Sequence, residues 1–288
     1  MYVLIYGLIN SFILSLISLG FALVYSIARV PNFAHGAIYV ATGYVGWLLL
    51  NKLPLPFPLV IVLALLFSAL VGALIYRIVL IRVRGMVLSE IIASYAIGIA
   101  ILEILRWGGL RGMTFMLPVL VPGSVEILGV SVDYQRLLIL AVSGGLLLFL
   151  HFFTHNTKTG LSFRAIAQDE RASLMLGIDS DRAALLSLSI GSAFCGLAAL
   201  FVLPLGNIVV EAGYSILIFA LAVCVVGGLG STAGVVTASF VLGFAQTLTE
   251  KLISSHFQMV VALLAIIGTL ILKPSGLFGK QKELEERV

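Results

Sequence analysis

The sequence predicts an all-α polytopic membrane protein with about eight or nine transmembrane helices, some of them short or broken. Of its 288 residues, 61% are hydrophobic and 10% are charged, and the mean hydropathy is +1.18. A soluble domain is roughly 45–50% apolar and about 25% charged. One core cannot bury so much apolar surface, and apolar runs recur to the far end of the chain, so lipid must cover much of it.

Each transmembrane helix needs about 20 apolar residues to cross a hydrocarbon core of about 30 Å. The runs that reach or approach this length are 3–27, 36–50, 58–80, 87–105, 136–154, 183–204, 214–229, 233–249 and 257–272. Two of these runs, 214–229 and 233–249, come from splitting the segment 212–249, which contains no charged residue but would extend about 57 Å as one helix. Four glycines between 227 and 234 interrupt it, which predicts two helices joined by a tight turn.

The second run is the shortest, because residues 36–50 would extend only about 22 Å as a helix. It forms either a short ninth span or a re-entrant segment that leaves eight. Before it stands S-I-A-R-V-P-N-F-A-H-G-A, residues 26–37, where Pro31 ends regular helical hydrogen bonding. This stretch is either a turn with one basic residue or a broken-helix element, in which Asn32 and His35 face a route or stabilise exposed backbone.

The basic residues indicate an orientation for the nine-span arrangement. If the polar segment 155–182 is cytoplasmic, five of the 17 Lys and Arg residues fall outside: Lys52, Arg106, Arg111, Arg136 and Lys251. The positive-inside rule then places the N terminus outside and the C terminus in the cytoplasm. With eight spans the N terminus changes sides.

The segment 155–182 is the part of the chain that looks soluble, and it predicts a short amphipathic helix. Its apolar positions recur at helical spacing: Phe163, Ile166, Ala167, Leu174 and Ile178. Gly160 precedes the helix and Gly177 stands at a C-cap position. Such a helix can lie on a membrane or dock into a groove of another protein, and a solvated connecting loop is the alternative.

Two further regions are candidates for a solute route. In the fourth run, Ser94 and Gly98 lie between Glu90 and Glu103, whose carboxylates either reach the membrane interface or mark a pathway. At the glycine turn the candidate residues are Gly227, Gly228, Gly230 and Ser231. A broken helix presents an N-terminus that attracts a carboxylate, whereas small residues can also serve only close helix packing.

Several kinds of chemistry are absent from the sequence. The single Gly-Lys pair, Gly279-Lys280, lacks the rest of a phosphate-binding loop, so any ATP must be hydrolysed by another subunit. No G-x-S-x-G or H-E-x-x-H motif is present, and we expect no enzyme activity. His151 and His155 are four residues apart but have no third ligand nearby, so no metal site is predicted.

The polar segment resembles the cytoplasmic coupling loop of ABC-transporter permeases for branched-chain amino acids. It carries the form T-x-x-G-x-x-x-R-A-x-x-x-D, which begins at Thr157. V-P-N-F-A-H-G-A at 30–37, V-V-G-G-L-G-S-T-A-G at 225–234 and K-P-S-G-L-F-G at 273–279 match other motifs of the same family in order. The general permease motif begins Glu-Ala-Ala, and here Arg171, Ala172 and Ser173 take those positions while Glu170 lies out of register.

This resemblance implies a single transmembrane permease domain over 1–288. It assigns the coupling loop to Gly160, Arg164, Ala165, Arg171, Ala172, Ser173 and Gly177. The candidate pathway residues come from the interrupted helix, the fourth run and the glycine turn: Asn32, Phe33, His35, Gly36, Ser94, Gly227, Gly228, Gly230 and Ser231. The assignment leaves open which side chains of the coupling loop contact an ATPase.

The function that the resemblance implies is the import of branched-chain amino acids, or of related small amino acids and amides, across the cell membrane of a prokaryote. The expected partners are two ATP-binding subunits, a homologous second permease in a heterodimer or homodimer, an extracytoplasmic solute-binding protein and the lipid bilayer, with no nucleic acid. This chain would bind no cofactor, since the ATPases use the ATP and Mg²⁺. A stand-alone ion-coupled transporter is the alternative, but the sequence lacks the buried mid-span charge pair or proton relay that it predicts.

Overall fold

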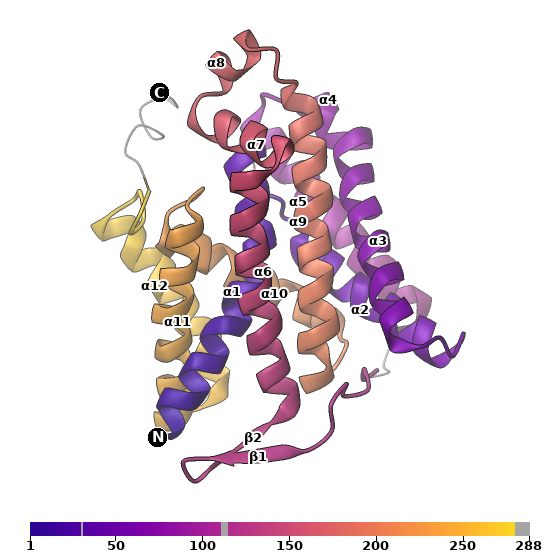
Figure 1. The fold of residues 1–288 in the computed structure, drawn as a ribbon, viewed down its shortest axis with the longest axis vertical. Coiled ribbons are helices and arrows are strands. Elements are labelled where there is room, and N and C mark those ends of the chain that lie inside the picture. The colour runs from indigo at the N-terminus through magenta and orange to yellow at the C-terminus, as the bar shows by residue number, and fades with distance from the viewer. Residues whose placement is uncertain (30, 111–114, 280–288) are drawn as a thin grey trace.

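The computed structural model describes residues 1–29, 31–110 and 115–279, and in this part the protein is almost entirely helical (Figure 1). The long helices are α1 (Tyr2–Ala28), α2 (His35–Asn51), α3 (Phe57–Ile75), α5 (Val87–Leu105), α6 (Tyr134–Asn156), α9 (Ser180–Val202), α10 (Val210–Gly227), α11 (Thr232–Leu252) and α12 (Gln258–Leu272). Each of the nine apolar runs therefore corresponds to a helix, and the predicted all-α membrane fold is confirmed.

Shorter elements join these helices. They are η1 (Tyr76–Leu80), α4 (Ile81–Val83), η2 (Arg106–Leu110), the strands β1 (Ser124–Ile127) and β2 (Val130–Asp133), α7 (Lys158–Gln168), α8 (Glu170–Met175), η3 (Leu203–Leu205) and η4 (Ser255–Phe257). The two strands form an antiparallel hairpin in which Ser124 pairs with Asp133 and Ile127 with Val130. No strand was expected in this connection, where the sequence has little periodicity.

Eight helices of the described chain are long and apolar enough to cross a membrane, counting α3 with its extension to Val83 as one. The helix α2 is not among them, because it has 17 residues. Although α2 is short, it carries the chain from the end of the bundle where α1 finishes back to the end where α3 begins (Figure 1), so the order of the helices along the bundle is that of the nine-span arrangement.

The bundle has two distinct ends. Helices α7 and α8 lie at one end, which we call the α7 end, and the β1–β2 hairpin lies at the other, the hairpin end (Figure 1). The N-terminus of α1 is at the hairpin end. The connection between α3 and α5 lies at the α7 end, where Arg84 reaches α8 and α9.

The helix α1 forms the centre of the bundle. In its most apolar 18-residue window, 78% of the residues are buried, against 6% for the window that contains α12. Helices α9, α10, α11 and α6 pack around α1. The outer helices keep apolar faces exposed, as expected for a protein whose surface is solvated by lipid.

The segment 155–182 contains two short helices rather than the one predicted amphipathic helix. The break is at Asp169, whose backbone is extended with φ −153° and whose side chain accepts a hydrogen bond from Ala172 N at the start of α8. The Asp169 side chain thus caps the start of α8 instead of allowing α7 to continue as one helix, because short polar side chains commonly compete for backbone hydrogen bonds in this way. Gly177, with φ 79°, ends α8, and Ile178 N donates to Ser173 O, so the C-cap prediction is confirmed.

Candidate functional site

The chain turns back into the bundle between α1 and α2. Arg29 ends α1 in a left-handed conformation with φ 58°, and its N–H donates to Tyr25 O. The Asn32 side chain is buried, and its Oδ1 accepts a hydrogen bond from Ala34 N at 3.1 Å. Asn32 O accepts from His35 N, also at 3.1 Å. Asn32 therefore stabilises backbone groups that the interrupted helix would otherwise leave without partners.

His35 anchors the beginning of α2 to the middle of α1. Its side chain is buried, with Nε2 2.9 Å from Ile17 O. Because a carbonyl oxygen only accepts, Nε2 must carry the proton. The imidazole stands edge-on to the Phe21 ring at a centroid distance of 5.7 Å, and Cys195 Sγ donates to His35 O at 3.1 Å.

Glycines allow the backbones around His35 to approach closely. A Cβ atom at Gly36 would overlap Gly213 O of α10, and one at Gly20 would overlap Gly191 O of α9. These four glycines and His35 form a layer with no room for larger side chains, which we call the closed layer. It joins α1, α2, α9 and α10 at one level of the bundle.

One face of α1 passes two clefts, one on each side of the closed layer. At the hairpin end, Ile13 lines a cleft of about 820 Å³ together with Tyr39, Arg136 and Ser215. At the α7 end, Val24 and Ala28 line a cleft of about 350 Å³. Positions 13, 17, 20, 24 and 28 follow the spacing of one helical face, so the closed layer separates two clefts along the same side of α1.

Ser94 and Phe33 meet beside the closed layer. Phe33 N donates to Ser94 Oγ at 3.3 Å, and Ser94 Oγ donates to Ile91 O. The Phe33 ring lies edge-to-face with Tyr95, with centroids 6.3 Å apart. A small cleft of about 220 Å³ adjoins these side chains and Gly213. The structure thus brings Phe33 and Ser94 together, and Gly36 lies near this cleft through its contact with Gly213.

The glycine turn lies against the C-terminal segment instead. Leu277 N donates to Val226 O at 2.8 Å, and Phe278 N donates to Gly227 O at 3.0 Å. Ser231 Oγ accepts from Gly234 N and caps α11. Gly228 and Gly230 adopt φ of 96° and 89°, a region that favours glycine. These contacts agree with close packing by small residues, the second of the two roles considered for Gly227, Gly228, Gly230 and Ser231. They bring the motif at 225–234 into contact with the motif at 273–279.

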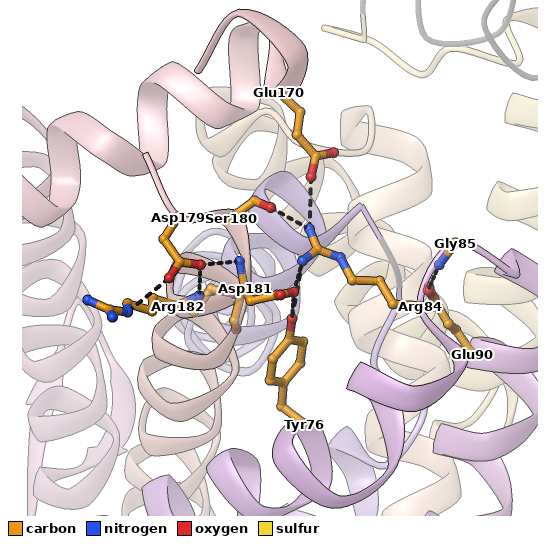
Figure 2. A network of polar contacts seen from close by, with 11 residues as sticks. Tyr76, Arg84, Gly85, Glu90, Glu170, Asp179, Ser180, Asp181 and Arg182 are labelled. Atoms are coloured by element: carbon orange, nitrogen blue, oxygen red, sulfur yellow. Dashed lines mark hydrogen bonds and ion pairs between the residues drawn. The ribbon is translucent and has the colours of Figure 1, made fainter. Parts of the chain in front are cut away.

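A cluster of polar contacts at Arg84 joins three segments at the α7 end (Figure 2). Arg84 Nη2 lies 2.8 Å from Glu170 Oε1 of α8 and 3.0 Å from Ser180 Oγ of α9. Arg84 Nη1 bonds to Asp181 Oδ1, which also accepts from the Tyr76 hydroxyl at 2.9 Å. We call this group the Arg84 clamp.

The Arg84 guanidinium at the centre of the clamp stays protonated. Partial burial lowers the pKa of Arg84, but Tyr76, Asp181 and Glu170 raise it by more, so the pKa lies above its ordinary value. The guanidinium is therefore positive at any pH that the protein meets. Because Arg84 lies between α4 and α5, the clamp ties that connection to α8 and α9.

Glu90 differs from the interfacial anchor that its sequence position suggested. Its side chain is 4% exposed, and Oε1 accepts from Gly85 N at 2.7 Å. Its other oxygen, Oε2, is buried and has no hydrogen-bond partner within residues 1–29, 31–110 and 115–279. Glu103, at the far end of α5, is instead partly exposed and lies 3.3 Å from Arg106 Nε.

The predicted coupling residues divide into buried and exposed sets. Gly160 is buried, and a Cβ there would overlap Phe153 O, so α7 packs closely on the end of α6. Ser173 is also buried and donates to Asp169 O, whereas Arg164 and Ala165 are half-buried. The exposed members are Arg171, Ala172 and Gly177.

Other polar groups form no further site in the described part of the chain. His155 Nδ1 lies 2.8 Å from His151 O, and their rings stack. Among the described residues, no three His, Cys, Asp or Glu side chains gather as a metal site would require. Cys195 and Cys224 are buried free thiols.

Sequence reasoning did not find the Arg84 clamp. Arg84 counted only as one of many basic residues near a span, and its partners on α8 and α9 are 86 to 97 positions away along the chain. The Arg84-Gly85 pair lies between two apolar runs, a position that does not indicate which carboxylates lie opposite.

Comparison with known proteins adds independent information. A family model described as the permease component of the branched-chain amino acid transport system matches residues 3–270. The chain is 28% identical over 292 residues to the high-affinity branched-chain amino acid transport system permease protein BraD of Pseudomonas aeruginosa, covering 96% of this chain and 95% of BraD. It is also 28% identical over 292 residues to LivH of Escherichia coli, a permease protein of the same kind of system, covering 92% and 91%.

Among solved structures, PsaBC from Streptococcus pneumoniae in complex with Fab is similar, with a TM-score of 0.53 and 15% sequence identity. The similarity covers 100% of this chain and 96% of that one, and at this identity it bears on the fold alone. The family match, in contrast, spans nearly the whole helical bundle, including α1, α2 and the segment 155–182. The chain therefore belongs to the family of branched-chain amino acid transport permeases.

Proposed function

We propose that this chain is the membrane-spanning permease subunit of an ABC importer for branched-chain amino acids, or for related small amino acids and amides. The observation that carries the proposal is the helix α8, which projects beyond the bundle of a chain from this permease family (Figure 1). The chain itself lacks a phosphate-binding loop. Separate subunits would hydrolyse the ATP with Mg²⁺, and this chain would bind no cofactor and catalyse no reaction of its own.

The surface of α8 suits docking to an ATPase subunit. Met175 is 89% exposed and Leu176 80% exposed, and Leu174 beside them is also exposed. Large apolar side chains that project beyond the spanning helices favour burial in a groove on another protein. Arg171 lies on the same short helix and is exposed, which adds a charged group at the rim of the surface.

The Arg84 clamp offers a physical route from docking to the spanning helices. Glu170 is the first residue of α8, and Asp181 lies in the first turn of α9. Arg84 binds both and lies in the connection that leads into α5. A displacement of α8 by the ATPases would therefore pull on α5 and α9 together, which both line the α7-end cleft.

The same arrangement supports an orientation. The α7 end would face the cytoplasm, with the N-terminus of α1 outside and the C-terminal segment inside, in the cell membrane of a prokaryote. The distribution of Lys and Arg favours this choice. The extracytoplasmic binding protein would then deliver solute to the hairpin end, where Arg136 lines the larger cleft. A guanidinium there would attract the carboxylate of an amino acid.

The complete importer would contain two ATPase subunits and two permease subunits, this chain and a homologous partner. Each permease would form one transmembrane domain. Asn32 and His35 would act by holding the α1–α2 junction, so that the closed layer separates the two clefts until ATP binding moves α8. Phe33, Gly36 and Ser94 lie at or beside the α1–α2 junction and would move together with it when α8 is displaced.

Reconstitution tests this proposal against the ion-coupled alternative. The chain, its partner permease, the ATPases and the binding protein are placed in proteoliposomes, and uptake of labelled leucine is measured. We expect uptake only when all components and internal ATP are present. Uptake by this chain alone, driven by an ion gradient, would overturn the proposal.

A further inference from the structure

A groove at the surface of the α7 end runs between α7 and the beginning of α9, and we call it the α7–α9 groove. Helix α7 lies across the end of α6 and also contacts α9 (Figure 1). A water-sized body can enter about 370 Å³ of the groove, many times the space that one water molecule needs. One face of each helix lines it, with the α8–α9 connection between them, and its lining includes Lys158, Ser162, Asp179, Arg182, Ala183 and Leu186.

The groove carries two basic side chains and one acidic side chain. Asp179 is already engaged at the start of α9, because its Oδ1 accepts from Asp181 N and Arg182 N at 3.0 Å each. Its Oδ2 lies 2.9 Å from Arg182 Nε, but the terminal nitrogens of Arg182 extend away from Asp179 (Figure 2), and the Arg182 side chain is 85% exposed.

Lys158 is the second basic residue of the groove, and it is also exposed. None of the ion pairs in the part of the chain that the structure describes includes Lys158. Among these residues the groove therefore keeps a net positive charge. An anion with several acceptor oxygens, such as a phosphate, is the ligand that a lysine and an arginine favour.

The groove lies at the level where two spanning helices end. Lys158 comes two residues after Asn156, the last residue of α6, and Arg182 is in the first turn of α9, which begins at Ser180. Both helices are long and apolar enough to cross a membrane. Basic side chains at the ends of spanning helices extend to the membrane surface and attract anionic headgroups there. An anion in the groove is therefore at the depth of a phospholipid phosphate.

Apolar side chains continue from the groove along the outside of α6 and α9. Leu186, which lines the groove, is exposed on α9. Phe149 of α6 is exposed too, and its ring lies edge-on to Phe194 of α9 with centroids 6.2 Å apart. An acyl chain attached to the phosphate can cover this surface. An acidic side chain of a protein partner has no such chain, so the combination of charge and apolar surface favours a lipid.

We propose that the α7–α9 groove binds the headgroup of an anionic phospholipid. The phosphate lies between Lys158 and Arg182, and an acyl chain follows Leu186 and Phe149. The bound lipid holds α7 and the start of α9 together at the membrane surface, while the exposed apolar side chains of α8 stay available to an ATPase. The inference goes beyond the proposed function, because it concerns the lipid around the permease and neither the solute nor the ATPase.

Native mass spectrometry of the purified full-length chain in a non-ionic detergent tests the site. Dioleoylphosphatidylglycerol and dioleoylphosphatidylcholine, which have the same acyl chains, are titrated separately. We expect phosphatidylglycerol to bind more tightly, because only its headgroup has a net negative charge. The double variant Lys158→Gln/Arg182→Gln should weaken phosphatidylglycerol binding about tenfold or more, close to the affinity for phosphatidylcholine, because each basic side chain near the membrane surface contributes to the attraction. Inorganic phosphate at the concentration of the lipid should not displace phosphatidylglycerol, because it lacks the acyl chains.

The double variant Arg77→Gln/Arg82→Gln is the matched control. It removes two exposed basic residues at the same end of the bundle, from η1 and α4, and should keep the wild-type affinity for phosphatidylglycerol. Thermal unfolding checks that each variant folds. If the groove variant does not fold, Ser162→Glu, which adds a negative charge to the groove and removes no basic group, should weaken the same binding.

Three results would overturn the proposal. The first is equal phosphatidylglycerol affinity in wild type and the groove variant, and the second is equal affinity of the wild type for the two lipids. The third is displacement of phosphatidylglycerol by an equal concentration of inorganic phosphate, which would indicate a site for a free anion. Loss of ATPase co-purification in the groove variant, with unchanged phosphatidylglycerol affinity, would assign the groove to the ATPase instead.

Discussion

His35 and Ile17 meet at the centre of the bundle, where Nε2 of His35 lies 2.9 Å from the carbonyl oxygen of Ile17. The next carbonyl of α1, that of Ser18, lies 3.9 Å from Cys224 Sγ in the last turn of α10. The start of α2, which follows the α1–α2 junction, and the end of α10, which precedes the glycine turn, therefore contact consecutive carbonyl groups of α1. This level of α1 is the natural place to test how the junction supports transport.

Asn32→Ala and His35→Ala should each impair transport while leaving ATPase docking intact. The Asn32 change removes the turn that begins α2, at a cost of about 1 kcal/mol. The His35 change removes a buried hydrogen bond and leaves a void beside Phe21, at a cost of about 2–4 kcal/mol. Leucine uptake, thermal unfolding and co-purification of the ATPases measure these effects.

His35→Gln provides the control, because its amide retains a donor that can reach Ile17 O. It should recover part of the lost stability and uptake. Loss of ATPase co-purification in the alanine variants would contradict a role confined to the α1–α2 junction.

Gly36→Ala should destabilise the protein by about 1–3 kcal/mol, the usual range for overpacking. A methyl group there overlaps Gly213 O, so α2 and α10 must separate. Gly145→Ala is the matched control, since nothing lies within 4 Å of the added Cβ on α6. Denaturation in detergent micelles should show a lower midpoint for Gly36→Ala alone, and equal midpoints would contradict the closed layer.

Arg84→Ala should uncouple ATP hydrolysis from uptake. Without the guanidinium, Glu170 and Asp181 lose their link to the α4–α5 connection, so movement of α8 no longer displaces α5. We expect the solute imported per ATP hydrolysed to fall about tenfold, within the usual range of coupling energies. Arg84→Lys should recover part of the ratio, because a lysine keeps the charge but not the several directed contacts.

The control for this experiment is Arg82→Ala, an exposed position two residues earlier. It should leave the ratio of uptake to hydrolysis unchanged. A ratio in Arg84→Ala that equals wild type would show that the clamp is not part of the coupling route.

Met175→Asp should weaken ATPase docking by about 2 kcal/mol or more, as expected for an anchor at the centre of an interface. The side chain is 89% exposed in the isolated chain, so the stability of the permease itself should not change. Leu128→Asp is the control, since Leu128 is 71% exposed in the turn between β1 and β2. Affinity pull-down of the ATPases should fail for Met175→Asp and succeed for Leu128→Asp.

The helices were predictable because each spanning segment must form the hydrogen bonds of its backbone N–H and C=O groups within itself. Each must also contain enough apolar residues to match the thickness of the membrane. The short α2, the separation of α10 from α11 and the C-cap at Gly177 followed from local composition in this way. The break at Asp169 was missed, because an apolar stripe at helical spacing continues across it. The β1–β2 hairpin was also missed, since four-residue strands carry a weak pattern.

The candidate site was predictable only in part. Asn32, His35 and Ser94 were recognised as unusual polar residues in apolar runs, and the structure places Asn32 and His35 at the α1–α2 junction and Ser94 against Phe33. Their hydrogen-bond partners, however, are backbone N–H and C=O groups. Every residue type carries a C=O group and nearly every type an N–H group, so the sequence gives no sign of which of them would be the partner. The sequence places the glycine turn among the candidate pathway residues together with this junction, but the direct contacts of the turn are with residues 275–279.

The sequence by itself determined the membrane class, the approximate positions of eight or nine helices and the resemblance to a permease family, because these depend on hydrophobicity and motifs read along the chain. Tertiary structure decided which polar groups meet: Arg84 with Glu170 and Asp181, and His35 with Ile17. It also decided that one oxygen of Glu90 has no hydrogen-bond partner among the residues that the structure describes. The physical reason is that helices pack through small residues and backbone contacts, which leave no distinctive pattern in the order of residues.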